Sequence, residues 1–270
     1  MTNEIFVVAH KEDTSHLESA LFNQGFSVHV QRGPYTAEQQ GWPSSMKCLV
    51  NHTNVWRQVA AGCHSVIVVE ADFVPVKNLA TRSSPLPSNI QDKSVGFAWL
   101  YSAGSILYGF DKDGFPHGHG NTTVAYILTP RTASILIEFS KLVISNNPTL
   151  AYSNWETHLG IYLRKQHGIL NYIPVYCYGE HGGIPQPEHS AAGVRAWHQA
   201  DILLDTLEFQ PPYAKGWKLI YKVIRFRSIF RGWYRFLTLR FYHPKYINSD
   251  SAKGRFAMGL FSLKRLLKLA

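Results

Sequence analysis

Residues 45–72, SMKCLVNHTNVWRQVAAGCHSVIVVEAD, decide the fold that we expect for this chain. Over residues 45–61 the apolar side chains recur at the spacing of one helix face, and Gly62 favours the end of that helix. The four β-branched residues Val66–Val69 then predict a fully buried strand. This strand runs directly into the acidic group Glu70-Ala71-Asp72, so two carboxylates are expected at the edge of a sheet.

The rest of the first 180 residues repeats this alternation of short apolar runs and helical patterns. The expected strands are Ile5–Ala9, Phe26–Val30, Val95–Leu100, Ala125–Leu128 and Ile173–Tyr178, and the expected helices cover residues 17–25, 130–143 and 153–167. Residues 104–120, rich in glycine and histidine, are expected to form a loop. The pattern predicts an α/β fold with a Rossmann-type, mostly parallel sheet and helices on both faces, and ligands then bind beyond the carboxyl ends of the strands.

The charge is distributed very unevenly along the chain. Of the 27 Lys and Arg residues, fourteen lie in residues 215–270, where Asp250 is the only acid. This segment therefore carries +13, and the other residues carry −4 of the total formal charge of +9. Such an asymmetry indicates an anionic partner for the basic segment. We therefore divide the chain into a catalytic domain, residues 1–212, and a basic helical tail, residues 213–270.

Within the tail, residues 215–240 and 256–269 interleave bases with large apolar side chains at helical spacing. Amphipathic helices of this kind lie in the interface of a bilayer, with their bases near anionic headgroups. Two other interpretations stay open. The helices could only pack on the catalytic domain, or they could bind single-stranded nucleic acid.

The compartment that we expect is the cytoplasm, with peripheral association at the inner face of the membrane. The three cysteines, Cys48, Cys63 and Cys177, are odd in number and show no metal-binding spacing, which argues against a disulfide framework. We expect no signal peptide at the start of the sequence and no transmembrane helix, because no apolar run is long enough.

Glu70 and Asp72 form the sharpest chemical feature. Hard divalent cations take oxygen ligands, and Mg2+ or Mn2+ commonly joins a carboxylate to a substrate phosphate. Such a cation would stabilise a departing diphosphate. The alternative is that both are ordinary polar residues at the end of a strand.

The segment Met46–Pro75 resembles the family 25 glycosyltransferases, which include lipopolysaccharide-synthesis transferases. Cys48, His52 and Trp56 hold the spacing of the family's helix, and Glu70 and Asp72 match the first and third acids that follow its strand. Asn51 stands where the family usually has Ser, and Ala71 replaces the middle acid, which removes one possible ligand.

A second block, Gly118–Ile135, resembles the family's next strand and helix through Ala125 and Tyr126. The resemblance covers roughly residues 4–180 and does not reach the tail. It implies a GT-A-like fold, a nucleotide-sugar donor that is often UDP-linked, and inversion at the anomeric carbon.

An inverting reaction needs one general base to take the proton of the acceptor hydroxyl. We expect Glu156, at the start of a helix, to be this base, with Glu180 and Asp201 as reserves. The alternative for Glu156 is a first-turn acid that interacts favourably with the helix dipole.

Several histidines are candidate ligands of the cation or the donor. His181 is expected to complete the metal site with Glu70 and Asp72, and His189 is its competitor. His10 and Lys11 follow the first strand and are expected near the diphosphate, while His52 is expected with Glu70 and Asp72 at the nucleotide-sugar. The pair His117 and His119 is expected to have a role in a substrate loop or none.

The sequence thus predicts a glycosyltransferase that moves a sugar from a nucleotide-sugar to a lipid-linked saccharide in cell-envelope polysaccharide or lipopolysaccharide synthesis. Two alternatives are kept. One is a transferase that uses a CMP-linked sugar with little metal dependence. The other is a non-catalytic protein on a decayed transferase fold that binds a membrane or nucleic acid.

Overall fold

The structure is a computed structural model, and it describes residues 2–89, 91–147, 151–183 and 199–268. The strands are β1 (Glu4–Val8), β2 (Ser27–Gln31), β3 (Val66–Glu70), β4 (Phe73–Pro75), β5 (Val95–Trp99), β6 (Ile106–Phe110), β7 (Pro116–His119), β8 (Ala125–Leu128), β9 (Leu170–Tyr172) and β10 (Gly179–His181). The helices are α1 (Ser15–Asn23), α2 (Ala37–Gln40), α3 (Ser44–Ala60), α4 (Pro130–Ser145), α5 (Trp155–His167), α7 (Lys218–Leu237), α8 (Pro244–Ser249) and α9 (Ala252–Leu267), with short 3-10 turns η1 (Leu79–Thr81) and η2 (Pro212–Ala214).

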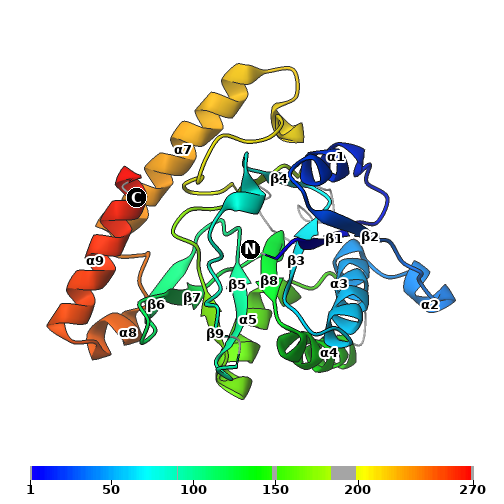
Figure 1. Cartoon of the computed structure of the whole chain (residues 1–270), viewed down its shortest axis with the longest axis horizontal. Coiled ribbons are helices and arrows are strands. Elements are labelled where there is room, and N and C mark those ends of the chain that lie inside the picture. Colours follow the sequence, from blue (N-terminus) through cyan, green and yellow to red (C-terminus); the bar gives the residue numbers. More distant parts are fainter. Residues whose placement is uncertain (1, 90, 148–150, 184–198, 269–270) are drawn as a thin grey trace.

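The central sheet has eight strands in the order β2-β1-β3-β8-β5-β9-β7-β6, and helices flank it (Figure 1). The pairings make six of the eight strands run in one direction, with β8 and β7 reversed. The predicted α/β class with a mostly parallel sheet and flanking helices is therefore confirmed. Two further strands, β4 and β10, form a small antiparallel sheet.

Alternate side chains of the central strands enter two separate cores. Along β1, Phe6 and Val8 pack on the face that α3, α4 and α5 cover, whereas Ile5 and Val7 pack on the opposite face with α1. β3 divides its residues in the same way, so both of its faces are buried. This burial explains why both strands are continuously apolar in sequence.

Two local predictions were wrong. Residues 104–120 contain the hairpin of β6 and β7 instead of a loop. A Cβ atom at Gly118 would lie 2.0 Å from the Ile106 carbonyl oxygen, so this strand pair requires glycine. The strand predicted over Ile173–Tyr178 is replaced by β9 before it and β10 after it. Pro174 interrupts the segment because proline has no N–H to donate to a neighbouring strand.

The three C-terminal helices lie along one edge of the molecule (Figure 1). Phe241, Tyr242 and Met258, from the segment that holds them, are buried in the same core as α3, α4 and α5. The Leu107 N–H donates to the Phe241 carbonyl (2.8 Å), which ties this segment to β6. The predicted boundary between residues 212 and 213 stays a prediction.

Candidate active site

Glu70 is fixed at the carboxyl end of β3 by contacts to the segment that enters β8. Its backbone N–H donates to the Val124 carbonyl (2.9 Å). Its Oε1 atom accepts a hydrogen bond from the Thr123 hydroxyl (2.6 Å) and lies 3.2 Å from Nε2 of His52. Both contacts fall on Oε1, so among the described residues the other carboxylate oxygen is left for a ligand.

His52 lies behind Glu70 on α3, with its side chain fully buried. Its Nδ1 atom is 2.9 Å from the Tyr126 hydroxyl, which accepts a hydrogen bond from the Trp56 indole N–H (2.8 Å). Because a carboxylate can only accept, Nε2 of His52 carries a proton and donates it to Glu70. His52 thus orients the Glu70 carboxylate, and any effect on a bound nucleotide-sugar would pass through Glu70.

Asp72 and His181 meet where β4 pairs with β10. The pairing sets His181 opposite Phe73, and the Gly182 N–H donates to the Asp72 carbonyl (2.7 Å). The Asp72 Oδ2 and His181 Nε2 atoms are then 2.9 Å apart. Burial alone would lower the pKa of His181, but the carboxylates of Asp72 and Glu70 outweigh it and raise the pKa to about 9.

Gly183 packs closely against this pair of side chains. A Cβ atom at Gly183 would lie 2.5 Å from Asp72 Oδ2 and 2.6 Å from His181 Nε2. Any other residue would therefore displace the Asp72 and His181 side chains from their present contact. The sequence signal for this close approach is the glycine pair that follows His181, whose importance sequence reasoning missed.

Glu156 lies in the first turn of α5, and the start of this helix is fastened to the start of α3. The Trp155 indole N–H donates to the Ser45 carbonyl, and the Ser153 N–H donates to the Ser45 hydroxyl (both 3.0 Å). Burial, followed by the charge of Glu70, raises the pKa of Glu156 to about 8. The charges of Glu70, Asp72 and His181 therefore all act on the Glu156 carboxyl group.

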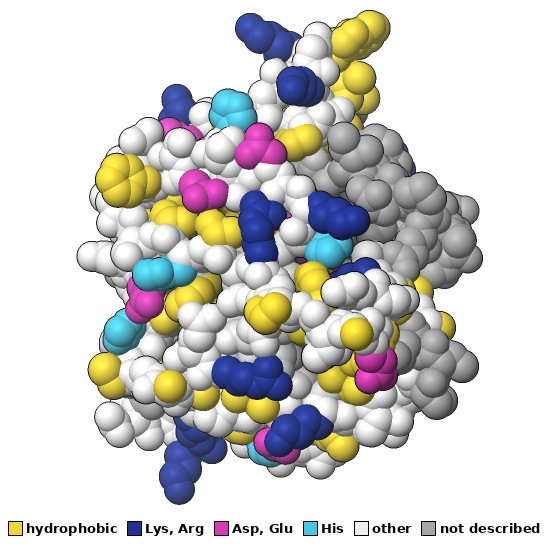
Figure 2. Space-filling view, turned by 90° about the vertical axis from the view of Figure 1, so that its right-hand side faces the viewer, with side chains coloured by type: hydrophobic (Ala, Val, Ile, Leu, Met, Phe, Trp, Pro, Cys, Tyr) yellow, Lys and Arg dark blue, Asp and Glu magenta, His cyan; other side chains and the backbone are white. Residues whose placement is uncertain are grey.

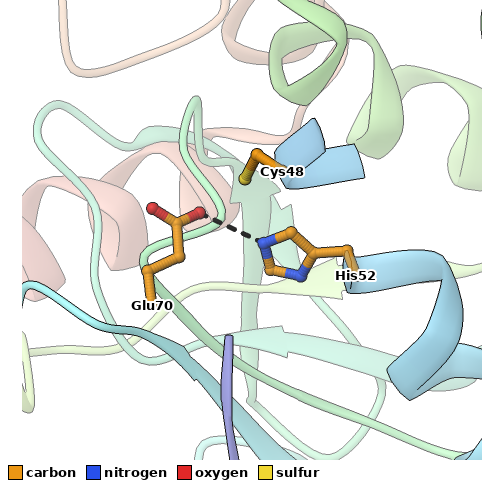
Figure 3. Close-up of side chains that lie close together, drawn as sticks. All are labelled: Cys48, His52 and Glu70. Carbon is orange, nitrogen blue, oxygen red and sulfur yellow. Dashed lines mark hydrogen bonds and ion pairs between the residues drawn. The ribbon is translucent and has the colours of Figure 1, made fainter. Parts of the chain in front are cut away.

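Cys48 is a further member of this region. Figure 3 shows Cys48 and His52 of α3 pointing toward Glu70, and the possible ligand atoms of these three residues lie within 4.8 Å of one another. Burial raises the pKa of the Cys48 thiol well above its usual value, and Glu70 and Glu156 raise it further. A neutral thiol is a poor ligand for a hard cation, so the carboxylate oxygens of Glu70 and Asp72 suit Mg2+ or Mn2+ better.

His10 belongs to a hydrogen-bonded group at the end of β1. Its Nδ1 atom is 3.0 Å from the Tyr35 hydroxyl. The Asn51 side-chain amide donates to this hydroxyl and to the Ala9 carbonyl (both 2.7 Å). Burial and the nearby Lys47 ammonium lower the pKa of His10, so its ring is neutral near pH 7.

Basic side chains surround the loop that follows β1 and begins at His10. Lys11 is exposed, and the Arg32 guanidinium donates to the His10 carbonyl (3.3 Å). The Lys47 ammonium lies 6.0 Å from the centroid of the Tyr35 ring. The loop also adjoins the acidic residues, because the Ala71 N–H donates to the Val8 carbonyl (2.9 Å). Sequence reasoning missed Arg32, Tyr35 and Lys47, which follow no recognisable motif and meet only in the fold.

The two other candidates for the general base, Glu180 and Asp201, lie outside the group formed by Glu70, Asp72, Glu156 and His181. Glu180 is fully buried and accepts a hydrogen bond from Arg225 (2.8 Å), and Asp201 is paired with arginines of α7 and α9. His117 lines a pocket near the amino ends of β5 and β9, at the opposite edge of the sheet from Glu70. His189 lies outside the described residues.

Comparisons with known proteins place the chain in no family. No protein-family model and no curated protein matches it. A solved glycosyltransferase involved in the glycosylation of the major capsid of PBCV-1 is 7% identical over 64% of this chain and 81% of its own, with a TM-score of 0.43. A presumed glucose-1-phosphate thymidylyltransferase from Bacillus anthracis, in complex with a sucrose, is 11% identical over 72% of this chain and 77% of its own, with a TM-score of 0.39. Both overlaps are too loose to carry an argument about function.

The site must therefore be argued from its own chemistry. Asp72 and His181 are in contact, and the charges of Glu70, Asp72 and His181 all act on the carboxyl group of Glu156. The basic side chains Lys11, Arg32 and Lys47 lie around the adjoining loop. Oxygen and imidazole ligands of this kind fit Mn2+ or Mg2+. The fold and the site together define an α/β protein with an acidic site at the carboxyl edge of its sheet.

Proposed function

We propose that this protein is a glycosyltransferase that moves a sugar from a nucleotide-sugar, UDP-linked in the favoured case, to a saccharide acceptor with inversion of configuration. The observation that carries the proposal is the group of Glu70, Asp72, Glu156 and His181 at the carboxyl edge of the sheet. Among the described residues, no Lys or Arg forms an ion pair with Glu70 or Glu156. A group with this excess of negative charge favours a cation.

Glu70 and Asp72 would hold Mn2+ or Mg2+, and His181 would assist after giving up the proton that its raised pKa keeps in the metal-free site. When bound, the cation would supply positive charge to the diphosphate as it leaves the sugar. His52 acts as a positioning residue, since it fixes one oxygen of the Glu70 carboxylate. His10 and Lys11, together with Arg32 and Lys47, would favour the anionic donor at the adjoining loop.

Glu156 is proposed as the general base. In the transfer, the acceptor hydroxyl oxygen forms a bond to the anomeric carbon while the bond from that carbon to the diphosphate oxygen breaks. The hydroxyl proton passes to the Glu156 carboxylate, and the diphosphate leaves with the bonding electrons. A base with a pKa near the working pH is effective in such a step.

The acceptor is proposed to be a saccharide carried by a lipid at the cytoplasmic face of a membrane, in cell-envelope polysaccharide synthesis. This part of the proposal depends on the membrane-docking surface argued in the next subsection. The nucleotide and the metal dependence do not depend on it, and they can be tested separately.

Calorimetric titration tests the proposal. UDP and then CMP are titrated into the full chain with and without Mn2+, for the wild type and for Asp72→Asn. We expect UDP binding that requires Mn2+ and is weakened at least about tenfold in Asp72→Asn. Glu138→Gln, which removes an exposed acid on α4, is the matched control and should bind as the wild type does.

Each other outcome contradicts part of the proposal. Binding of CMP without metal would keep a transferase but remove the cation site at Glu70 and Asp72. Failure to bind either nucleotide would favour a non-catalytic protein on a transferase-like fold. Equal weakening in Glu138→Gln would show that the loss is not specific to the site.

A further inference from the structure

Helix α7 is packed with its charged side inward. The residues that face the body include three arginines together with small side chains: Arg225, Ser228, Arg231, Gly232 and Arg235. Ser228 and Gly232 are buried, and the arginines are at most about one-third exposed. A helix of a globular protein normally turns its apolar stripe toward the core, so this arrangement is inverted.

The inward arginines meet the two buried acids of the body. Arg225 donates to Glu180 (2.8 Å) and to the Ala200 carbonyl (2.7 Å). Arg231 donates to Asp201 through two nitrogens, at 3.0 and 2.7 Å, and Arg235 donates to the other oxygen of Asp201 at 3.3 Å. These arginines hold α7 in place and are not available to an external anion.

The outward side of α7 is apolar. It presents large side chains at intervals of three, four or seven residues, between 57% and 74% exposed: Leu219, Val223, Phe226, Phe230 and Leu237. Five such side chains on one line are a contiguous apolar strip, which a water-facing surface of a monomer rarely shows.

Helix α9 repeats the inversion. Met258, Ser262 and Arg265 are buried, and the Arg265 guanidinium donates to the Val175 carbonyl (2.7 Å). The outward side again carries large apolar residues at intervals of three or four, between 37% and 72% exposed: Phe256, Leu260, Leu263 and Leu267. The two helices lie along the same edge of the molecule, with the sheet on their other side (Figure 1).

Exposed bases accompany both apolar strips. They are Lys218, Lys222 and Arg227 on α7, and Lys253, Arg255 and Lys264 on α9. The two helices contain no acid. The opposite side of the molecule, by contrast, shows acids, bases and histidines side by side (Figure 2).

We infer that the outward sides of α7 and α9, here called the α7–α9 face, dock on the interface of an anionic lipid bilayer. Apolar side chains enter the boundary between headgroups and acyl chains, and flanking bases contact lipid phosphates. Within the described residues, no helix is long and apolar enough to cross a bilayer. The proposal concerns binding at the bilayer surface, and it does not depend on the proposed sugar transfer.

A second copy of the chain is the other candidate occupant of this face. Pairing two α7–α9 faces would bring bases against bases without a single helix acid to compensate, which is unfavourable. An anionic lipid surface compensates the same charges, at about 1 kcal/mol for each base near it. The charge pattern therefore favours the bilayer.

Vesicle co-sedimentation of the full chain tests the inference. The vesicles contain phosphatidylcholine alone or phosphatidylcholine mixed with phosphatidylglycerol. We expect binding to the anionic vesicles only, weakened by salt, and at least about tenfold weaker for the double variant Phe226→Ser with Phe230→Ser. Phe22→Ser, which removes a phenylalanine that is 72% exposed on α1, is the matched control and should bind as the wild type does.

Three results would overturn the inference. The first is failure of the wild type to bind anionic vesicles, and the second is equal weakening by Phe22→Ser. The third is a wild-type dimer in light scattering that the double variant converts to a monomer, because the face would then be covered by a second copy. Far-ultraviolet circular dichroism of both variants verifies that they are folded.

Discussion

Two groups of charged side chains, one partly buried and one largely buried, lie back to back in this protein and differ in composition. The site cluster consists of Glu70, Asp72, Glu156 and His181. The anchor cluster consists of Glu180, Asp201, Arg225, Arg231, Arg235 and Arg265. Strand β10 links them, because successive residues of a strand point to opposite sides: Glu180 contacts Arg225, and its neighbour His181 contacts Asp72.

The difference lies in how the carboxylates are compensated. In the anchor cluster every acid is paired with at least one arginine, so its charge serves to fasten α7 and α9 to the body. In the site cluster Glu70 contacts His52 and Asp72 contacts His181, and among the described residues neither Glu70 nor Glu156 pairs with a Lys or Arg, which leaves negative charge that a cation could neutralise. Neutralising one acid of the anchor cluster should therefore destabilise the protein, whereas neutralising one acid of the site cluster should stabilise it.

The largest effect is expected for Asp201→Ala. This side chain is 1% exposed, and its removal leaves Arg231, Arg235 and Arg265 without their shared carboxylate. Breaking such a buried pair costs about 3–5 kcal/mol, measured as the free energy of unfolding in urea. A loss below about 1 kcal/mol would mean that the arginines find other partners and that Asp201 does not anchor the helices.

Glu156→Gln should show the opposite sign, and the size of the effect depends on pH. Burial and Glu70 raise the pKa of Glu156 from 4.5 to about 8, so the folded state keeps a proton that the unfolded state loses. The stability that this proton contributes is complete below about pH 4.5 and is lost as the pH rises through about 8. The variant, which cannot ionise, should match the wild type near pH 4.5. At pH 9 it should exceed the wild type by roughly 2–3 kcal/mol, about half of what the full shift would give, because Glu156 is partly exposed to solvent.

The measurement is thermal and urea unfolding of both proteins across this pH range, with a chelator present so that no cation compensates the site. Glu138→Gln, which removes an exposed acid, should show no such pH dependence. A variant that is less stable than the wild type at pH 9 would show that Glu156 is held by a favourable partner, as in the anchor cluster.

The smallest effect is expected for Phe226→Ser, at the residue next to Arg225 of the anchor cluster. Phe226 follows Arg225 on α7 but points outward, with 74% of its surface exposed. Phe226→Ser should change the free energy of unfolding by no more than about 0.5 kcal/mol, because the side chain has little packing to lose. A cost above about 1 kcal/mol in urea unfolding would indicate that the outward side of α7 is covered in the free protein.

Part of the site could be predicted from local sequence. Glu70 and Asp72 follow directly from a buried strand that ends in two acids, and the expectation that they lie at the carboxyl edge of the sheet agrees with the structure. The sequence also suggested His181 as a metal ligand and Glu156 as the general base. In the structure, the charges of Glu70 and Asp72 raise the pKa of both residues. Their roles as ligand and base stay predictions.

The role of the bases in the C-terminal segment could not be predicted. The sequence shows fourteen of them, and nothing in their spacing separates Arg225 from the neighbouring Arg227. In the structure, Arg225, Arg231, Arg235 and Arg265 are used inside the protein. Their acidic partners lie far away in sequence, and only the fold brings them together. The predicted basic membrane surface is thus reduced to the remaining bases.

The sequence by itself determined the elements whose signal is local: the buried strands, the helices between them and the acids at a strand end, because periodicity and β-branching act within a few residues. It also determined that the C-terminal helices are amphipathic. Only the tertiary structure decided which side of those helices faces inward. Amphipathicity normally predicts the apolar side, but Glu180 and Asp201 are buried and must be compensated, so the helices turn their arginines toward the body and leave the apolar side outside.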